Sequence, residues 1–272
     1  MPQIISDLQD LTYLSWAQAR QSSGTAGSFL KSYDDSGPRK VYYKLSDYRA
    51  GTGIVGHECI NEIVVDRFLS LLGIDHLGYR LIHANVLVDG AVYETWLNAS
   101  DDFKAPGESK IALDTYYELQ RAQDESPLSF CIRMGWSQRI WEMLVVDYLI
   151  LNRDRHGANL EVLRNPRARS IRLAPLFDHG LSLLWQCHTT DAIGAFDVMQ
   201  DVRVQSFVGT HSAEDNLKLI PHDEFPKLKS LYESDRSALF DGLEAATSPE
   251  WQDAVWSMIW QRWCHLETLR TS

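Results

Sequence analysis

The sequence predicts an α+β protein with a small β-rich N-terminal part and a larger, mainly helical C-terminal part. Short runs of β-branched and aromatic residues, separated by turn signals, fill much of the first hundred residues. Beyond that point, apolar residues recur at helical spacing over long stretches. This change of pattern predicts two parts, over residues 1–97 and 98–272.

In the N-terminal part, the first expected strand covers Lys40–Leu45, and Lys44 lies within it. A flexible, hydroxyl-rich loop precedes this strand at Ser22–Ser28. A helix is expected after it, because apolar residues over 60–72 recur at helical spacing and Gly73 is placed to end the helix. The remaining expected strands are Tyr79–His83, Asn85–Val88 and Val92–Leu97.

In the C-terminal part, a helix with one broad apolar face is expected over Ile140–Leu149. It leads into the loop Asn152–Asn159, and a hairpin over 160–173 then returns the chain so that Asp178 can meet Asn159. Three segments follow: an irregular, polar stretch at 185–219 and helices at 225–245 and 249–268.

Composition narrows the class of protein. The 272 residues are 44% hydrophobic and 23% charged, which suits a globular chain with a full core. Lys and Arg number 26 against 37 Asp and Glu, so the formal charge of −11 argues against direct binding to nucleic acid or to anionic membranes. The four cysteines form no Cys-x-x-Cys pair, and no signal or membrane-spanning segment is recognisable. A cytoplasmic protein is expected.

Three oxygen-bearing side chains are brought together by the order of the C-terminal elements. Asp154 and Asn159 lie in the loop after the apolar helix, and Asp178 follows the hairpin. Mg²⁺ usually takes only one or two carboxylates from a protein and completes its shell with water and phosphate oxygens. The set therefore favours Mg²⁺ held against the phosphates of a nucleotide.

Phosphoryl transfer also needs a cation on the phosphates, a loop that covers them and a base near the acceptor hydroxyl. Lys44 is placed on a strand from which its ammonium can reach phosphate oxygens. Asp154 is the candidate base or orienter of the hydroxyl. The backbone N–H groups of a short loop before Lys44 can face phosphates; its residues are Gly24, Thr25, Ala26, Gly27 and Ser28.

Each residue also has a purely structural interpretation. Asp154 can cap a loop, Asn159 can form a turn, and Lys44 can be a surface lysine at a sheet edge. Taken singly, these interpretations are favoured. The ordered set of helix, Asp-x4-Asn, hairpin and Asp, with a lysine upstream, favours the functional interpretation.

The two motifs resemble a known family. Asn152-Arg153-Asp154-Arg155-His156-Gly157-Ala158-Asn159 and Leu173-Ala174-Pro175-Leu176-Phe177-Asp178 look like the catalytic and metal-binding segments of the HipA-like serine/threonine kinases. The first string also resembles that of the phosphoinositide 3/4-kinases. The similarity is strongest at 149–180. It implies a bilobal protein-kinase-like fold, with ATP and Mg²⁺ in the cleft between the lobes.

The resemblance also implies roles for individual residues. Asp154 would be the catalytic aspartate, Asn159 and Asp178 the metal ligands, and Lys44 the lysine on the ATP phosphates. Glu62 is the candidate partner of Lys44, with Glu58 as the alternative. The adenine-binding hinge would lie at Val92–Leu97, through Glu94, Trp96 and Leu97. The loop over 22–28 would cover the nucleotide and be open to autophosphorylation at Ser22, Ser23 or Ser28.

The expected function is an ATP- and Mg²⁺-dependent protein serine/threonine kinase of the HipA-like type. Its expected partners are a protein substrate and a separate antitoxin or inhibitor protein. Three alternatives are left open: a pseudokinase or nucleotide-binding interaction module, a lipid or small-molecule kinase, and an AMP-transferase on the same fold.

Overall fold

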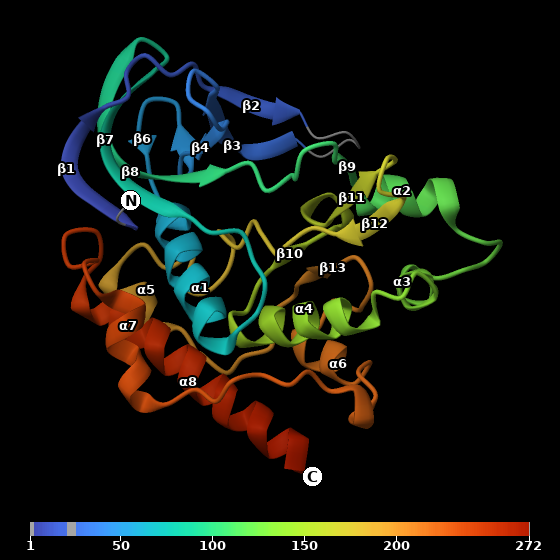
Figure 1. The fold of residues 1–272 in the computed structure, drawn as a ribbon. Coiled ribbons are helices and arrows are strands. Elements are labelled where there is room, and N and C mark those ends of the chain that lie inside the picture. Colours follow the sequence, from blue (N-terminus) through green and yellow to red (C-terminus); the bar gives the residue numbers. More distant parts are fainter. Residues whose placement is uncertain (1–2, 21–25, 272) are drawn as a thin grey trace.

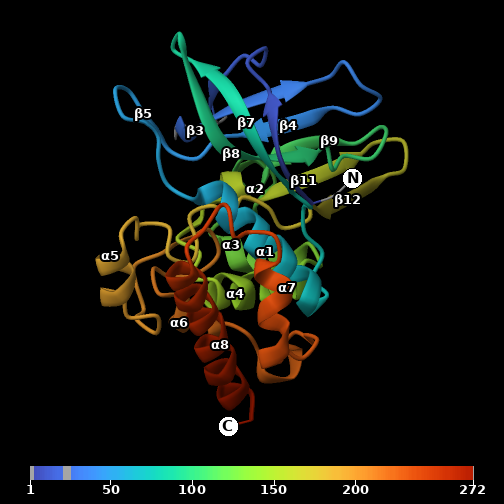
Figure 2. The ribbon, with the colours of Figure 1, turned by 90° about the vertical axis from the view of Figure 1, so that its left-hand side faces the viewer.

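The computed structural model describes residues 3–20 and 26–271. It has two lobes, with a β-sheet at the top of Figure 1 and helices below it. The view in Figure 2 shows the same division, with the C-terminus at the far end of the helical lobe. A long helix, α1 (Glu58–Leu72), lies between the sheet and the helical lobe. The α+β, bilobal architecture predicted from the sequence is confirmed.

The sheet of the N-lobe has six strands in the order β1-β7-β8-β4-β3-β2. β1 pairs in parallel with β7, and the other neighbours are antiparallel. A hairpin turn at Asp89-Gly90 joins β7 to β8, and both turn residues have positive φ, at 50° and 82°. The strands are β1 (Ile4–Asp10), β2 (Ala17–Arg20), β3 (Ala26–Asp34), β4 (Val41–Lys44), β7 (Arg80–Val88) and β8 (Ala91–Asp101).

Three predictions about these strands need correction. β7 is one continuous strand, because Ala84 at the predicted break is buried and pairs with Thr95. β8 runs to Asp101, past the expected boundary at residue 97. β3 begins at Ala26, so the backbone of the last residues of the expected loop is part of a strand. The other loop residues, among them Gly24, Thr25, Ser22 and Ser23, lie outside the described residues.

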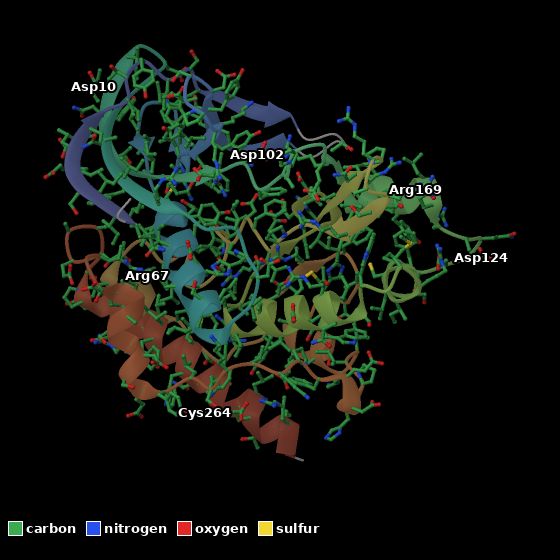
Figure 3. All side chains as sticks on the ribbon, in the orientation of Figure 1. Asp10, Arg67, Asp102, Asp124, Arg169 and Cys264 are labelled. Carbon is green, nitrogen blue, oxygen red and sulfur yellow. The ribbon has the colours of Figure 1, made fainter. Side chains whose placement is uncertain are left out.

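Helix α1 joins the lobes. It ends as predicted at Gly73, whose left-handed conformation (φ 75°) lets its N–H bond back to the last turn. Toward the helical lobe, the Arg67 guanidinium donates to the carbonyls of Leu239 and Asp241 at 2.9 and 2.8 Å, and Figure 3 labels Arg67 between α1 and α7.

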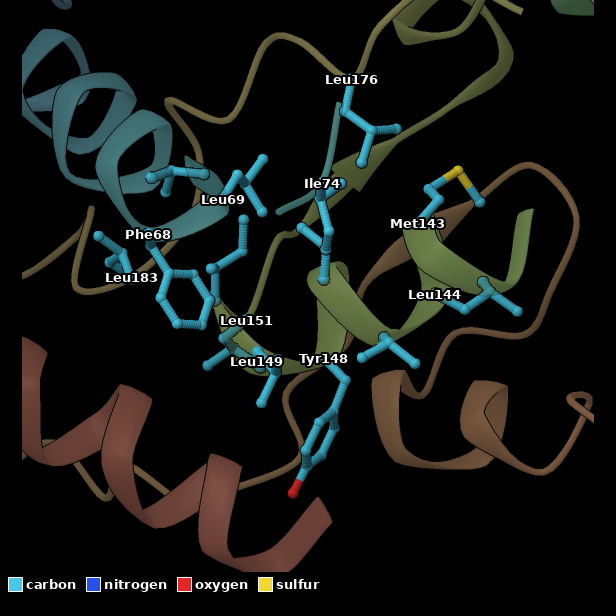
Figure 4. Packing of buried hydrophobic residues seen from close by; sticks show 14 of the residues in the cluster. Phe68, Leu69, Ile74, Met143, Leu144, Tyr148, Leu149, Leu151, Leu176 and Leu183 are labelled. Carbon is cyan, nitrogen blue, oxygen red and sulfur yellow. The ribbon is translucent and has the colours of Figure 1, made fainter. Parts of the chain in front are cut away.

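Buried residues of α1 and α4 (Ser137–Leu149) form one core that extends through the helical lobe. Figure 4 shows Phe68 and Leu69 of α1 beside Leu149 and Leu151 at the end of α4. A second, smaller cluster lies within the N-lobe. The remaining helices are α2 (Leu113–Gln120), α3 (Pro127–Arg133), α5 (Thr190–Ala195), α6 (Ala213–Leu217), α7 (Arg236–Phe240) and α8 (Pro249–Thr271).

The predicted hairpin is present as β11 (Glu161–Asn165) and β12 (Ser170–Leu173), and β11 also pairs with β9 (Ser109–Ala112). The closing helix predicted at 249–268 is confirmed as α8. The helix predicted over 225–245 is wrong, because only the 3-10 turn Glu233–Asp235 and the short helix α7 form there. Over residues 225–232 the chain runs without regular structure, with the Lys229 N–H donating to the Leu72 carbonyl at the end of α1.

Two pairs of short strands are also present: β5 (Tyr48–Arg49) with β6 (Gly53–Ile54), and β10 (Asp154–Arg155) with β13 (Gln205–Ser206). Short 3-10 turns lie at Gly157–Asn159, His222–Glu224 and Glu233–Asp235. Within the described ranges, no helix combines the length and the apolar character that crossing a bilayer requires.

Candidate active site

Lys44 is at the centre of a buried ion-pair cluster. It lies on β4, inside the sheet, where β3 and β8 flank it. Its Nζ is 3.1 Å from Glu62 Oε1 on α1 and 2.5 Å from Asp178 Oδ1. The alternative partner, Glu58, instead accepts a hydrogen bond from the Asp47 N–H at 3.2 Å. The structure therefore pairs Lys44 with Glu62.

The surrounding charges favour the ionised forms of Lys44 and Asp178 in this cluster, whereas burial raises the pKa of Glu62. Burial alone would lower the pKa of Lys44, but the nearby charges of Asp178 and Glu62 outweigh burial and raise it. For Asp178, burial opposes ionisation, but Lys44 and then Lys31 hold its pKa below the usual range. Lys44 is therefore an ammonium and Asp178 a carboxylate at neutral pH.

Asp178 is fixed by contacts around its backbone. Its φ of 59° is in the left-handed region, a conformation that is uncommon for non-glycine residues and is often found at functional sites. The Asp178 N–H donates to the Tyr79 hydroxyl at 3.2 Å, and the His179 N–H donates to Glu62 Oε2 at 2.9 Å. Asn61 Nδ2, also on α1, donates to the Gly180 carbonyl at 2.8 Å. Helix α1 thus holds the two residues that follow Asp178, while Tyr79 binds the N–H of Asp178 itself.

The loop with Asp154 and Asn159 is organised by a buried arginine. Arg155 makes an ion pair with Asp147 of α4, with 2.8 Å between Nη2 and Oδ1. Its Nη1 donates to the carbonyl of Phe177, the residue before Asp178, at 2.9 Å. This one side chain therefore connects α4, the loop and the segment that carries Asp178.

Asn159 and Asp154 contact each other directly. Asn159 Nδ2 donates to the Asp154 carbonyl at 2.8 Å and to its Oδ2 at 3.3 Å. β13 lies against the outer side of the loop, where the Gln205 N–H donates to the Arg153 carbonyl at 2.9 Å. The loop is therefore held by backbone pairing as well as by side chains.

A cleft of about 420 Å³ lies between the two lobes, beside this cluster. Its volume is in the range of small-molecule sites. Lys31, Lys44, Glu62 and Asp178 contribute charged groups at one part of its wall. The other lining residues include Tyr42, Tyr79, Asn98, Ser100, Asp101, Asp102, Phe103, Lys110, Glu161 and Phe177.

The expected hinge residues lie away from this cleft. Glu94 pairs with His83 at 3.0 Å, Trp96 stacks on His83 with 4.8 Å between ring centroids, and Leu97 is buried in the N-lobe cluster. The error comes from the length of β8. Side chains alternate along a strand that rises about 3.4 Å per residue, so the continuation to Asp101 moves the end of β8 well past Leu97. Asp102 follows this strand end, and Figure 3 labels it on the side of the N-lobe that faces the helical lobe.

The donor set fits Mg²⁺. The amide nitrogen of Asn159 donates a hydrogen bond to the Asp154 carbonyl. The side-chain oxygen of Asn159 therefore remains as the atom that can ligate a metal. Asp178 supplies a carboxylate, and hard oxygen donors are what Mg²⁺ prefers. In the described part of the chain no group of three or more His, Cys, Asp or Glu side chains could hold a metal by itself. The donors therefore suit an ion that shares its shell with phosphate and water.

Sequence reasoning missed Lys31, Arg155 and Tyr79. Lys31 is the register partner of Lys44 on β3, and its Nζ is 3.9 Å from Asp178 Oδ2. It was missed because no strand was predicted there. Arg155 lies within the recognised motif, but nothing in its neighbours along the chain indicates an ion pair with Asp147. Tyr79 comes to the site through the pairing of β7 in the sheet.

The comparison with solved structures supports this architecture. No protein-family model and no curated protein matches the sequence. Among solved structures, the proinflammatory kinase CtkA of Helicobacter pylori superimposes with a TM-score of 0.60 at 17% identity, over 93% of both chains. The HipA, HipB and operator DNA toxin–antitoxin complex of Shewanella oneidensis gives a TM-score of 0.41 at 15% identity, over 92% of this chain and 57% of that one. The first likeness establishes a shared fold.

Proposed function

We propose that this protein is an ATP- and Mg²⁺-dependent kinase of the HipA-like type that transfers the γ-phosphoryl group to a protein serine or threonine. The observation that supports it most is the charged cluster of Lys44, Glu62 and Asp178 in an interlobe cleft. Arg155 connects that cluster to the loop with Asp154 and Asn159. The lysine, the two carboxylates and the loop come from segments that are far apart in the sequence. Chance therefore does not explain why they lie together.

Each residue then has a definite task. Lys44 and Lys31 bind phosphate oxygens, while Glu62 orients Lys44. Asn159 and Asp178 would hold Mg²⁺, which neutralises phosphate charge when bound. The acceptor hydroxyl oxygen forms a bond to the γ-phosphorus as the bond to the β–γ bridging oxygen breaks, and ADP leaves with that electron pair. Asp154 accepts the hydroxyl proton.

Asp154→Asn tests the assignment. The amide keeps the size of the side chain but cannot accept the proton, so transfer from γ-labelled ATP to a protein acceptor in a cell lysate should fall by about 100-fold or more. Thermal stabilisation by Mg-ATP should persist, since ligand binding stabilises the native state by mass action. Undiminished transfer by the variant would refute the role of Asp154. No thermal shift of the wild type at millimolar Mg-ATP would favour an interaction module without a working nucleotide site.

The acceptor and the transferred group need separate tests. Label from γ-labelled but not from α-labelled ATP distinguishes phosphoryl transfer from AMP transfer. Acid hydrolysis of the labelled product, followed by identification of phosphoserine or phosphothreonine, distinguishes a protein acceptor from a lipid or small molecule.

Regulation of this kinase is proposed at two levels, by autophosphorylation of the loop over 22–28 and by a separate inhibitor protein. Autophosphorylation at Ser22, Ser23 or Ser28 is tested by intact mass and peptide analysis after incubation with Mg-ATP, and no added phosphate would contradict it. A separate antitoxin or inhibitor protein is tested by whether a co-purifying protein suppresses transfer.

A further inference from the structure

We propose that Glu161 and Lys110 recognise the adenine base through its amino edge. This inference rests on the proposed function, because it assumes that a nucleotide occupies the cleft. It goes further by assigning base recognition to two side chains on neighbouring strands, β11 and β9. Both side chains line the same cleft as Lys44 and Asp178.

Glu161 has an incomplete set of hydrogen-bond partners. Its side chain is only 14% exposed, and its Oε1 lies 2.9 Å from Lys110 Nζ. Its other oxygen, Oε2, is buried and has no hydrogen-bond donor among the described residues. Buried carboxylate oxygens are normally paired, because leaving water without a new donor costs free energy. Oε2 is therefore an acceptor suited to an N–H group of a ligand.

The surroundings of Glu161 suit a flat ring. Phe103 and Phe177 stack with 5.9 Å between ring centroids and an interplanar angle of 28°. Lys110 Nζ lies 5.8 Å from the Phe103 centroid. Aromatic walls bind nucleobases by stacking. Phe177 also directly precedes Asp178, so the aromatic wall continues along the chain into the segment of the phosphate-binding cluster.

The chemistry of the pair matches adenine. The 6-amino group of adenine is a donor beside N1, which is an acceptor. A carboxylate can only accept and an ammonium can only donate. Glu161 Oε2 would take an N–H of the amino group, while Lys110, half of whose side chain is exposed, would donate to N1.

The same ion pair also connects β9 to β11, so it contributes to the structure of this small sheet. A purely structural role predicts that removing Glu161 changes stability but leaves the preference for the amino group unchanged. Glu108 offers a matched control, because it makes a similar ion pair with Arg172, at 2.9 Å, and does not line the cleft.

The test combines a change in the protein with a change in the ligand. Calorimetry measures the affinity of the full chain for three ligands: Mg-ATP, Mg-tripolyphosphate and the Mg complex of purine riboside triphosphate. The last of these lacks the 6-amino group of adenine. The wild type and Glu108→Leu should prefer ATP over the deaminated nucleotide by about tenfold or more, as expected for a hydrogen bond to a charged acceptor. Glu161→Leu should lose this preference and bind tripolyphosphate as the wild type does.

Each outcome has a definite meaning. An unchanged preference in Glu161→Leu, or a wild-type preference near one, overturns the inference. The inference is also overturned if the wild type binds 2′-deoxy-ATP more weakly than ATP but binds the deaminated nucleotide as tightly as ATP, because the preference then depends on the ribose. If Glu161→Leu does not fold, Glu161→Gln replaces it and should reduce the preference. Failure of the wild type to bind either ATP or tripolyphosphate would contradict the proposed function itself.

Discussion

At the scale of single residues, Lys44 has the largest electrostatic role in the candidate site. It is the shared partner of two carboxylates, Glu62 on α1 and Asp178 in the segment after β12. A lysine in this position prevents repulsion between two acids, and under the proposed function it would also bind a phosphate. Its removal should therefore affect activity and stability together.

We predict that Lys44→Met lowers phosphoryl transfer by about 100-fold or more, since a fixed cation near developing charge is lost. It should also lower the free energy of unfolding at pH 7 by about 3 kcal/mol, because buried carboxylates lose their counter-charge. Urea unfolding measures the second effect. Lys218→Met is the control, because this lysine is 73% exposed and its surface ion pair contributes little. Equal stability of the two variants would contradict the prediction.

The same substitution gives a prediction about pH. In the wild type, the pKa of Asp178 is held below its usual range, so its contribution to stability is present above the unfolded-state value and is lost as pH falls through the folded-state pKa. Without Lys44, the pKa values of the neighbouring carboxyl groups of Glu62 and Asp178 should be raised. Protonation of these groups should then stabilise the folded state of the variant. The stability difference between wild type and Lys44→Met should thus shrink from pH 7 to pH 4. A constant difference would exclude this ion pair as its source.

At the scale of elements, the loop with Asp154 is positioned by close packing from outside the site. A Cβ added at Gly157 would lie 2.5 Å from Asp114 Cβ on α2 and 2.9 Å from Phe207 Cδ2. It would also lie 3.0 Å from the Asp114 backbone nitrogen, which cannot rotate away. The approach of α2 to this loop therefore requires glycine.

Gly157→Ala should displace the loop, destabilise the protein by about 1–3 kcal/mol as overpacking does, and reduce transfer more strongly than nucleotide binding. Thermal unfolding and separate assays of Mg-ATP binding and transfer check this. Gly194→Ala is the matched control, because nothing lies within 4 Å of its added Cβ and alanine favours the helix α5. If Gly157→Ala behaves like Gly194→Ala, the loop does not depend on this packing.

At the scale of the whole molecule, α1 makes the two lobes interdependent. It carries Glu62 for the site, packs on the sheet, and contributes Phe68 to the core that continues into α4. Loss of packing at Phe68 should therefore weaken both lobes and not only the nearer one.

Phe68 is fully buried, so Phe68→Ala should lower the free energy of unfolding by about 3–5 kcal/mol. Circular dichroism, which reports on the helices, and hydrogen exchange in β7 and β8 should show one common unfolding transition. Its midpoint should lie at a lower denaturant concentration than in the wild type. Leu119→Ala, at a position 66% exposed on α2, should change stability by less than about 0.5 kcal/mol. Separate transitions for sheet and helices would show that α1 does not couple the lobes.

The sequence by itself determined the fold class, the β4 strand with Lys44, helix α1 with its end at Gly73, and the order of loop, hairpin and Asp178. These features depend on local periodicity and turn chemistry, which neighbouring residues specify. The sequence also indicated Asp154, Asn159 and Asp178 as one set, because a short hairpin leaves few ways to arrange them.

Only the tertiary structure decided which distant groups meet. It paired Lys44 with Glu62 and not with Glu58, placed Lys31 beside Asp178, and brought Asp102 and Phe103 to the cleft in place of Glu94 and Trp96. It also replaced most of the helix predicted at 225–245 by irregular chain. The physical reason is that strand register, strand length and packing against other elements are set by contacts between residues far apart in the chain, and local patterns do not contain them.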